Sequence, residues 1–464
     1  MIYTDISEVL SHGESYSGKK VRVAGWVRTA RDSKTMAFLA LNDGTSLKHL
    51  QIVVNKAAFD ADALAACLKS GVAVEAEGEV VPALVDAGGF ELNAESIALI
   101  GDCPADYPLQ KKYHSLEFLR TIPHLRVRTN TFNAMLRVRS KVSYALHRFF
   151  QERGYTYIHT PIITGSDCEG AGEIFRVTTN GYAEAKASRD EEEYIARDFF
   201  KRKAGLTVSG QLEGEVAAMA MGKIYTFGPT FRAENSNTPR HAAEFWQIEP
   251  EVAFAKLPDI IKIAESMIKY VIRAALDECA EEIAFFEKAF EKGLTEKLEK
   301  VASSEFAVLD YTEAIDILEK CGEQFAYPVS WGLDLQTEHE RYITEKVLGK
   351  PVFVTNYPKK IKSFYMKQND DGKTVAATDL LVPGVGEIIG CSEREADYDK
   401  LTAAMVERGM NLDDYKGYME LRRYGSVPHS GFGLGLERIL MYITGIGNIR
   451  DLQLYSRTSG DLMA

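Results

Sequence analysis

The sequence predicts an α+β protein: a small N-terminal β-barrel, followed by a larger domain of antiparallel strands flanked by helices. Three observations lead to this prediction. Strand-like segments and one helical segment fill the first hundred residues. A long amphipathic helical pattern follows at about residues 131–153. Two strand-like segments joined by a polar loop lie at residues 225–252, and such a pair forms an antiparallel hairpin.

Size and composition indicate a globular protein with a large core. The chain has 464 residues, of which 45% are hydrophobic, and this length allows two or three domains. No apolar run is long enough to cross a bilayer, and the first residues, MIYTD, lack the basic and apolar segments of a secretion signal. We therefore expect a soluble, cytoplasmic protein with no membrane partner.

Cysteine usage and net charge exclude several classes of site. The six cysteines, at positions 67, 103, 168, 279, 321 and 391, form no Cys-x-x-Cys pair and no Cys/His cluster. This pattern predicts neither a structural zinc site nor a disulfide framework, and free thiols suit a reducing compartment. The net charge of −12 would repel RNA on average, so any contact with RNA must be local.

The first hundred residues have the element order of an OB-fold barrel. Alternating apolar residues predict strands at 21–27, 36–41 and 50–54, a helix at 57–70, and further strands at 72–81 and 90–100. Three strands, a helix and two strands is the order of this five-stranded barrel. Such barrels bind single-stranded nucleic acid by stacking bases on aromatic side chains.

The region after the barrel changes from irregular to helical. Residues 104–128 contain prolines at 104, 108 and 123 and are predicted to be a hinge. From Thr131 to Arg153, apolar residues recur at helical spacing. They are Phe132, Leu136, Val138, Val142, Leu146, Phe149 and Phe150. Periodicity alone leaves two interpretations of this face open, an intrachain core and an interface with another subunit.

A charged hairpin is predicted near the middle of the chain. The runs at 225–231 and 244–252 have strand composition, and the NSNTP stretch between them predicts a loop. Arg232, Glu234 and Glu249 would then share one antiparallel hairpin. Because an unpaired buried charge is costly, these residues belong either to a structural salt-bridge lattice or to a ligand site.

The string GLGLER, from Gly433 to Arg438, opens an apolar helix. Its glycines would let the backbone lie close to a bound nucleotide, and Arg438 could project a planar cation onto an adenine ring or onto phosphates. Taken alone, the same glycines could equally serve the packing of a strand on a helix. Together with the charged hairpin, the string favours a nucleotide site.

The helical segment, the hairpin and the glycine string resemble the three signature motifs of the class II aminoacyl-tRNA synthetases, in the correct order and spacing. The chain is similar to the aspartyl/asparaginyl/lysyl subgroup nearly from end to end. The resemblance implies an OB-fold anticodon-binding domain at residues 1–103, a hinge at 104–130 and a class II catalytic domain at 131–464. It also implies a homodimer that assembles through the motif 1 helix.

Within this subgroup the chain is most similar to the asparaginyl branch. That implies ATP-dependent activation of L-asparagine to asparaginyl-adenylate and transfer to the 3′ end of tRNA(Asn). In the aspartyl branch a lysine stands three positions after a pocket glutamine, whereas this chain has Gly214 there. Loss of that cation disfavours a carboxylate relative to a carboxamide of nearly equal volume. The alternatives are an aspartyl or nondiscriminating enzyme and a noncatalytic tRNA-binding paralogue.

The resemblance implies a set of residues for the amino acid. Asparagine presents an ammonium, a carboxylate and a neutral carboxamide, so its site needs an acid, a cation and groups for the amide. The implied residues are Glu169 on a mobile loop, Ser209 and Gln211 on a strand, Glu249 near the ammonium, and Arg394 at the side-chain head group. Glu249 and Glu169 both remain candidates for reading the amide NH2.

A second implied set binds ATP. Arg232 and Arg438 would stabilise the phosphates as catalytic residues, and Phe245 and Arg438 would sandwich the adenine. Glu234, also expected to be catalytic, would accept from the adenine amino group or orient the loop. No protein nucleophile is required, because catalysis consists of positioning and of stabilising phosphate charge.

Two acidic residues match family carboxylates that hold Mg2+ on the phosphates of ATP. They are Asp379 and Glu387, and hard oxygen ligands of this kind suit Mg2+. Acidic residues are usually solvated, yet both of these lie among apolar and glycine residues. We therefore expect a metal-binding role, which is the stronger expectation for Glu387.

The stretch from Gly25 to Phe38 resembles the anticodon-binding face of the family's barrel. By this resemblance Phe38 would stack on the middle anticodon base, while Arg31 and Gln51 would contact anticodon bases. An aromatic residue in a strand usually packs inward, so ordinary barrel core is the competing interpretation for Phe38.

One departure from the family pattern lies close to the expected site. Cys391 stands where a glycine is usual, three residues before Arg394. It could narrow the pocket or make the activity sensitive to thiol reagents.

Overall fold

The computed structural model describes residues 3–83, 89–168, 174–236 and 238–462. Contacts within the chain divide it into two compact units, Met1–Ala134 and Met135–Ala464. The helix α6 crosses this division. The hinge at 104–130 stays a prediction, because the division into compact units does not test where the functional domains meet.

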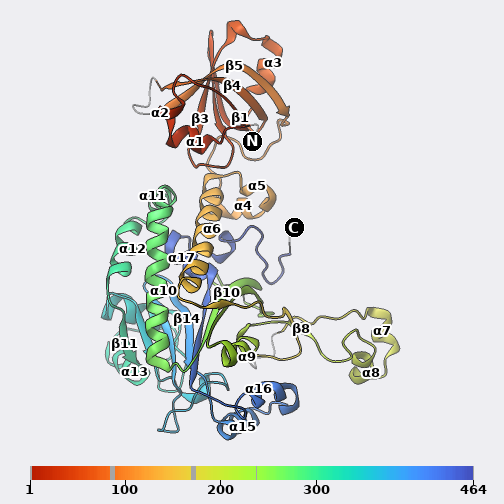
Figure 1. The fold of residues 1–464 in the computed structure, drawn as a ribbon, viewed down its shortest axis with the longest axis vertical. Helices are drawn as coiled ribbons and strands as arrows, with labels where there is room; N and C mark the ends of the chain where they lie inside the picture. Colours follow the sequence, from red (N-terminus) through yellow and green to blue (C-terminus); the bar gives the residue numbers. More distant parts are fainter. Residues whose placement is uncertain (1–2, 84–88, 169–173, 237, 463–464) are drawn as a thin grey trace. The chain divides into compact units, whose positions relative to one another are not determined.

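The first unit contains the predicted barrel (Figure 1). Its strands close in the order β1-β2-β3-β5-β4, as expected for the OB fold. Their bounds are β1 Lys20–Asp32, β2 Met36–Asn42, β3 Leu50–Asn55, β4 Ala73–Pro82 and β5 Phe90–Gly101. The helices α1 Ile6–Ser11 and α2 Gly13–Tyr16 precede the barrel.

Alternation of side chains builds the barrel interior. Val21, Val23 and Val27 of β1 are buried, and so are Ala37 and Leu39 of β2, because alternate residues of a strand face the same side. The predicted helix is shorter than expected, α3 Ala61–Cys67. It begins where Asp60 accepts a hydrogen bond from the amide of Ala63 at 2.9 Å.

The segment after the barrel is more regular than the sequence predicts. It contains two short helices, α4 Leu116–Arg120 and α5 Pro123–Arg126. Ser115 caps α4 by accepting from the amide of Phe118, and Pro123 occupies the first position of α5, where a missing N–H costs nothing. The prolines that predicted irregularity are therefore compatible with helix starts. Arg126 is buried and lies over the ring of Phe132, 4.2 Å from its centroid.

The second unit is built on an eight-stranded sheet in the order β11-β12-β13-β14-β15-β10-β9-β6. The six central strands are antiparallel, as predicted, while the edge pairs β11/β12 and β6/β9 are parallel. The bounds are β6 Thr156–Tyr157, β9 Lys223–Phe231, β10 Glu244–Ala253, β11 Ala307–Asp310, β12 Val352–Thr355, β13 Ala377–Val382, β14 Gly386–Glu393 and β15 His429–Gly435. A separate pair consists of β7 Ile163–Thr164 and β8 Gly205–Leu206.

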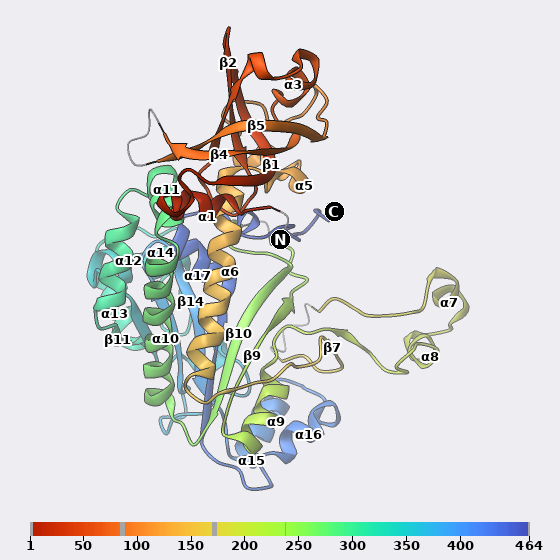
Figure 2. The same cartoon turned by 45° about the horizontal axis from the view of Figure 1, so that its top comes forward.

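Helices flank this sheet (Figures 1 and 2). The two longest helices lie side by side. Arg148 of the first donates a hydrogen bond to Tyr270 of the second and forms an ion pair with Glu278. These two are α6 Asn130–Gln151 and α10 Leu257–Glu278. The others are α9 Gln211–Met221, α11 Ala280–Ala289, α12 Leu294–Ser303, α13 Tyr311–Lys320, α14 Thr337–Arg341, α15 Tyr398–Glu407, α16 Lys416–Glu420 and α17 Leu436–Thr444.

The helix predicted at residues 131–153 is confirmed as α6. Its predicted apolar face is buried within the chain itself, apart from the half-buried Leu136. The intrachain core is therefore the explanation of this periodicity, and the face gives no separate support to a subunit interface.

An extended segment leaves the second unit between β7 and β8. It carries the short helices α7 Tyr182–Ala187 and α8 Glu191–Ala196, and both views show it projecting away from the sheet (Figures 1 and 2). Its tip holds exposed aromatic side chains, including Tyr182 and Phe199. Across the described ranges, no helix combines the length and the apolar character needed to cross a membrane.

Candidate active site

A cavity of about 320 Å³ lies on one face of the central strands of the second unit. Its wall combines the hairpin β9/β10 with β13, β14, β15 and the start of α17. The lining includes Ser209, Gln211, Arg232, Glu234, Phe245, Glu249, Asp379, Glu387, Arg394 and Arg438. The fold thus brings together ten of the residues that the sequence predicts for the amino acid, ATP and Mg2+.

Strand β10 supplies four cavity residues from one of its faces. They are Phe245, Gln247, Glu249 and Glu251, every second residue along the strand. Alternate side chains of a strand point to the same side, so the pattern follows from the register of β10 between β9 and β15.

Arg232 lies directly after β9, at the start of the loop that joins the two strands of the predicted hairpin. Its guanidinium carbon is 5.4 Å from the centroid of the Phe245 ring, and its Nη1 is 3.9 Å from Glu234. Within the described part of the chain, the buried Nε of Arg232 has no hydrogen-bond partner. A buried donor without a partner is costly, and this one belongs to a cavity residue, where a ligand oxygen could accept from it.

Arg438 lies in the first turn of α17, and its side chain reaches β14. Its Nη1 donates to the main-chain carbonyl of Glu387 at 3.0 Å and to the carboxylate of Glu387 at 3.1 Å. Burial opposes the charge on both groups, yet their mutual attraction raises the pKa of Arg438 and, with Lys362, lowers that of Glu387. Both side chains are therefore charged in the folded chain.

The two carboxylates predicted to hold Mg2+ lie on neighbouring strands. Asp379 of β13 pairs in register with Gly390 of β14, and a side chain at 390 would lie 3.5 Å from Glu387 and 3.8 Å from Asp379. Lys362 donates to Asp379 at 2.5 Å. Burial raises the pKa of Asp379 to about 6, although Lys362 opposes the shift.

These carboxylates suit a hard cation shared with a ligand. In the described ranges, no group of three or more His, Cys, Asp or Glu is arranged to hold a metal by itself. Two oxygen donors on a cavity wall do fit Mg2+, because this ion usually keeps waters and binds through one or two carboxylates and substrate phosphates. Burial and, after it, the nearby charge of Glu387 raise the pKa of Glu340, a neighbour of these carboxylates, to about 8.

At the other end of the cavity, Ser209 and Gln211 surround Glu249. The hydroxyl of Ser209 and the amide of Gly210, at 2.8 Å, both donate to the carboxylate of Glu249. The expected strand around Ser209 is wrong. The strand β8 ends at Leu206, and Gln211 is the first residue of α9. A helix start can present backbone N–H groups to an anion, which explains how Gly210 reaches Glu249.

Arg394 is buried beneath this end of the cavity. Its Nε donates to Glu251 at 3.2 Å, its Nη2 donates to the same carboxylate, and its Nη1 donates to Ser392 at 2.6 Å. Burial raises the pKa of Glu251 to about 7, although Arg394 opposes the shift. In this structure, therefore, the guanidinium expected at the substrate side chain is bound by two protein groups.

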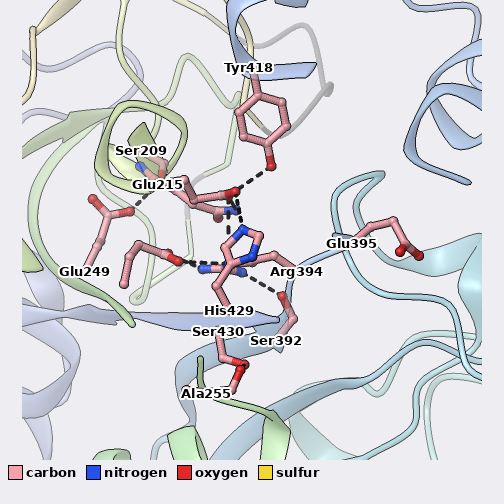
Figure 3. A network of polar contacts seen from close by, with 12 residues as sticks. Ser209, Glu215, Glu249, Ala255, Ser392, Arg394, Glu395, Tyr418, His429 and Ser430 are labelled. Atoms are coloured by element: carbon pink, nitrogen blue, oxygen red, sulfur yellow. Dashed lines mark hydrogen bonds and ion pairs between the residues drawn. The ribbon is translucent and has the colours of Figure 1, made fainter. Parts of the chain in front are cut away.

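A buried polar network continues behind Arg394 (Figure 3). Its centre is Glu215 of α9, which is fully buried. One of its oxygens faces Gln211 and Tyr418, and the other faces Arg422 and His429.

Several cavity residues are absent from the sequence prediction, and Glu169 lies outside the described residues. The missed residues that line the cavity include Arg240, His241, Gln247, Glu251 and Lys362. The alternation of β10 could have identified Gln247 and Glu251, because they are in phase with the predicted Glu249. Arg240 and Lys362 carry no comparable signal, since loops bring them to the cavity.

The three residues expected to contact an anticodon share the outer surface of the barrel. Register pairs Arg31 with Phe38, and the guanidinium carbon lies 4.6 Å from the ring centroid. Phe38 is half-buried between the inward-facing Ala37 and Leu39, so it is not a barrel core residue. Gln51 of the neighbouring strand β3 donates to Glu91 at 2.7 Å.

Comparison with known proteins agrees with this geometry. The family model for tRNA synthetases class II (D, K and N) matches residues 115–459, and the model for the OB-fold nucleic acid binding domain matches residues 21–100. The chain is 56% identical to the asparagine–tRNA ligase of Acetivibrio thermocellus over 455 residues, and 53% identical to that of Clostridium novyi over 460 residues. Each alignment covers 98% of both chains.

The fold is also similar to a solved structure that contains a reaction intermediate. The crystal structure of asparaginyl-tRNA synthetase from Pyrococcus horikoshii complexed with asparaginyl-adenylate matches with a TM-score of 0.88. Sequence identity is 34%, and the match covers 100% of each chain.

Proposed function

The chain belongs to the class II tRNA synthetases of the D, K and N group, and we propose that it is an asparagine–tRNA ligase. In the first step the carboxylate of L-asparagine attacks the α-phosphorus of ATP, and pyrophosphate leaves with the bonding electrons. In the second step the 3′-terminal ribose hydroxyl of tRNA(Asn) attacks the acyl carbon of the adenylate, and AMP leaves. The products are charged tRNA, AMP and pyrophosphate.

One observation carries the proposal: a single cavity has guanidinium groups at one end and a carboxylate that accepts hydrogen bonds at the other. Arg232 has an unpartnered buried Nε, as judged from the described residues, and Arg438 lies on the same wall. Ser209 and Glu249 line the opposite end. ATP needs the first set of groups, and an amino acid with its ammonium needs the second.

We assign the nucleotide to the end that contains Arg232 and Phe245. Arg232 would bind the α-phosphate and the substrate carboxylate, and so would bring the two reacting groups together. Phe245 and Arg438 would enclose the adenine, with Glu234 as acceptor for its amino group or as support for the loop. The guanidinium groups would stabilise the charge that develops on the phosphates.

Asp379 and Glu387 are the residues that would hold Mg2+. A bound Mg2+ would neutralise phosphate charge. Repulsion between acids supports that role, because the charge of Glu387, after burial, contributes to the raised pKa values of both Glu340 and Asp379. Lys362 would keep Asp379 charged and oriented until the ligand arrives.

The amino acid would occupy the end that contains Ser209, Gln211 and Glu249, with Arg394 at its side-chain head group. Gly214 supports asparagine over aspartate, because a side chain at this position would face Glu251 at 3.7 Å. A lysine there would add a cation beside the pocket, and the chain has none at this position. Glu169 lies outside the described residues, so Glu249 is our candidate for accepting a hydrogen bond from an N–H group of the substrate.

The barrel is the proposed binding site for the tRNA anticodon. Phe38 would stack on a base, and Arg31 and Gln51 would contact base edges. This proposal is supported by the outward position of all three side chains and by the Arg31 guanidinium over the Phe38 ring. The matching family model describes the barrel as nucleic acid binding.

We also propose that the enzyme is a cytoplasmic homodimer. Support for a dimer comes from exposed apolar side chains near the sheet edge formed by β6. They include Tyr157, Ile162, Ile163 and Trp246, each between 37% and 45% exposed. A cytoplasmic location would supply the ATP and tRNA that the reaction consumes.

Pyrophosphate exchange with asparagine and aspartate side by side tests this function. Exchange that depends on asparagine supports the ligase. Exchange with aspartate alone would reassign the substrate, and similar rates with both would identify a nondiscriminating enzyme. Absence of exchange with either would favour a noncatalytic tRNA-binding protein. Charging assays with anticodon variants of tRNA(Asn) would then test the barrel.

A further inference from the structure

Glu215 occupies the position one helical turn after Gln211, on the same face of α9. It is completely buried, and four polar side chains contact its carboxylate. Oε1 accepts from Nε2 of Gln211 at 3.0 Å and from the hydroxyl of Tyr418 at 2.9 Å. Oε2 accepts from Nη2 of Arg422 at 2.5 Å and faces Nε2 of His429 at 2.9 Å (Figure 3).

This arrangement determines which end of the Gln211 carboxamide faces Glu215. An ionised carboxylate only accepts hydrogen bonds, so the group that contacts it must be the NH2 of Gln211. The oxygen and nitrogen of an amide are assigned from their partners, and here the partner permits one assignment. The carbonyl oxygen of Gln211 is therefore turned away from Glu215.

We propose that Glu215 is a positioning residue for amino-acid selection, acting through Gln211. It keeps the NH2 group of Gln211 out of the substrate pocket and leaves the carbonyl oxygen as the atom offered there. This inference rests on the proposed function and extends it to a residue that does not line the cavity. The pocket then presents acceptors, Gln211 and Glu249, to the N–H groups of asparagine.

The two oxygens of Glu215 have different tasks. Oε2 lies between Arg422 and His429, both buried, and this pairing compensates the buried charge. Oε1 is on the side of Gln211, and it also lies 3.9 Å from Nε of Arg394. Oε2 therefore stabilises the fold, whereas Oε1 fixes the orientation of the Gln211 amide at the pocket.

Replacing Glu215 by glutamine should reverse the Gln211 amide. The oxygen of the introduced carboxamide would remain toward Arg422, because a guanidinium can only donate, and its NH2 would then face Gln211. Gln211 could satisfy that donor only by turning its own oxygen inward, which brings its NH2 into the pocket. A donor at this place suits a carboxylate ligand and repels an N–H group.

The test compares Glu215→Gln with Glu213→Gln, the same change two residues away on α9. Glu213 accepts from Thr164 at 3.4 Å and is not part of the cavity wall. Pyrophosphate exchange gives KM for asparagine and for ATP, and competition gives Ki for aspartate. We expect Glu215→Gln to raise KM for asparagine by about ten- to a hundredfold, as for a lost charge-assisted hydrogen bond. The ratio of Ki for aspartate to KM for asparagine should fall at least about tenfold.

Glu215→Asp provides a second test should the glutamine variant fail to fold. It keeps a negative charge near Arg422 and His429 but withdraws the oxygen from Gln211 by one methylene. KM for asparagine should rise severalfold while KM for ATP stays unchanged. Glu213→Asp is its matched control.

A double-variant cycle with Gln211→Ala distinguishes positioning from general damage. If Glu215 acts through Gln211, adding Glu215→Gln to Gln211→Ala leaves KM for asparagine unchanged. Equal rises in KM for asparagine and ATP, an effect that persists without Gln211, or wild-type KM values in both Glu215 variants would overturn the inference. A wild-type chain without asparagine-dependent exchange would contradict the proposed function as well, so the two failures are distinguishable.

Discussion

Arg438 holds Glu387 at two points, because the same nitrogen, Nη1, donates to the main-chain carbonyl and to the carboxylate of Glu387. The bond to the carbonyl ties α17 to β14 independently of the carboxylate. If Glu387 turns toward another ligand, the guanidinium therefore keeps its place on the cavity wall. The pair combines a fixed cation with a carboxylate that is free to exchange partners.

Arg438→Ala should lower kcat/KM for ATP in pyrophosphate exchange by roughly a hundredfold or more. The variant loses charge-assisted hydrogen bonds of about 3 kcal/mol and leaves Glu387 without its cation. Arg438→Lys should recover part of the loss, since it restores a charge but not the planar guanidinium group. Arg189→Ala, which changes an exposed arginine on the projecting segment, should retain wild-type kinetics. Similar losses in both alanine variants would contradict the assignment.

Glu340→Gln should stabilise the protein, and increasingly so at higher pH. The pKa of Glu340 rises from its ordinary 4.5 to about 8 on folding because of burial and the charge of Glu387. Between these two pKa values the folded chain therefore binds more protons than the unfolded chain. The contribution of Glu340 to stability falls as pH rises from about 4.5 to about 8. The free energy of urea unfolding of Glu340→Gln, relative to wild type, should increase by at least about 1 kcal/mol between pH 5 and pH 8.5.

Glu338→Gln, on the same helix α14, is a control with the opposite sign. Glu338 accepts from the amides of Ala326 and Tyr327, which lower its pKa. Its stabilising effect is present above pH 4.5 and is lost as pH falls through the lowered pKa. The glutamine variant should therefore be less stable than wild type at pH 7, with a difference that shrinks in acid. If the difference in unfolding free energy between each variant and wild type does not depend on pH, the pKa shifts of Glu340 and Glu338 are refuted.

Two glycines of β15 should differ sharply in their tolerance of alanine. A methyl group at Gly431 would overlap the carboxylate of Glu251 and displace it from Arg394. Breaking such a buried pair costs about 3–5 kcal/mol. A methyl group at Gly433 would lie 3.3 Å from Nε2 of Gln247, the mobile end of a side chain, so its cost should stay below about 1 kcal/mol. Denaturant unfolding of the two variants compares these values directly.

Thiol reagents should leave the activity intact, contrary to the sensitivity that the sequence allows for Cys391. Cys391 is 3% exposed, and burial raises its pKa, so the unreactive thiol form dominates. Iodoacetamide at pH 8 should label Cys321, the partly exposed cysteine, before Cys391. Peptide mass spectrometry and pyrophosphate exchange on the same sample provide the check. Early labelling of Cys391 with loss of exchange would show that the cavity admits the reagent.

Phe38→Ala should weaken tRNA charging without affecting amino-acid activation. Loss of base stacking costs about 1–3 kcal/mol, which would raise KM for tRNA by roughly five- to a hundredfold. Tyr3→Ala is a matched control, because Arg22 covers Tyr3 on the same barrel much as Arg31 covers Phe38. Equal effects of the two substitutions, or a loss of pyrophosphate exchange in Phe38→Ala, would contradict a local role in tRNA binding.

Much of the fold could be predicted because hydrophobic alternation reports directly on the side of a strand or helix that is buried. The barrel order, the hairpin after Lys223 and the helix α6 all follow from such patterns. The parallel edge strands β6 and β11 were not predicted, since each is short and its partner is far along the chain. The strand expected around Ser209 came from the family resemblance, and this segment instead connects the end of β8 to the start of α9.

The site could be predicted in part, through motifs, but its supporting interactions could not. Arg232, Glu387 and Arg438 line one cavity, as expected. Three of the partners of Glu215 lie more than two hundred residues away, at Tyr418, Arg422 and His429. One sequence contains no information about such distances, so only the folded chain reveals that a buried acid orients Gln211.

The regular spacing of the β10 cavity residues has a consequence for how this enzyme can vary. Since Phe245, Gln247, Glu249 and Glu251 depend on one phase of one strand, an amino acid inserted or deleted within it would turn every following side chain to the opposite side of the sheet. Single replacements can adjust one contact while the others persist. We therefore expect the length of this segment to be far less variable than its composition, and engineered substrate preferences to arise by exchanging side chains in place.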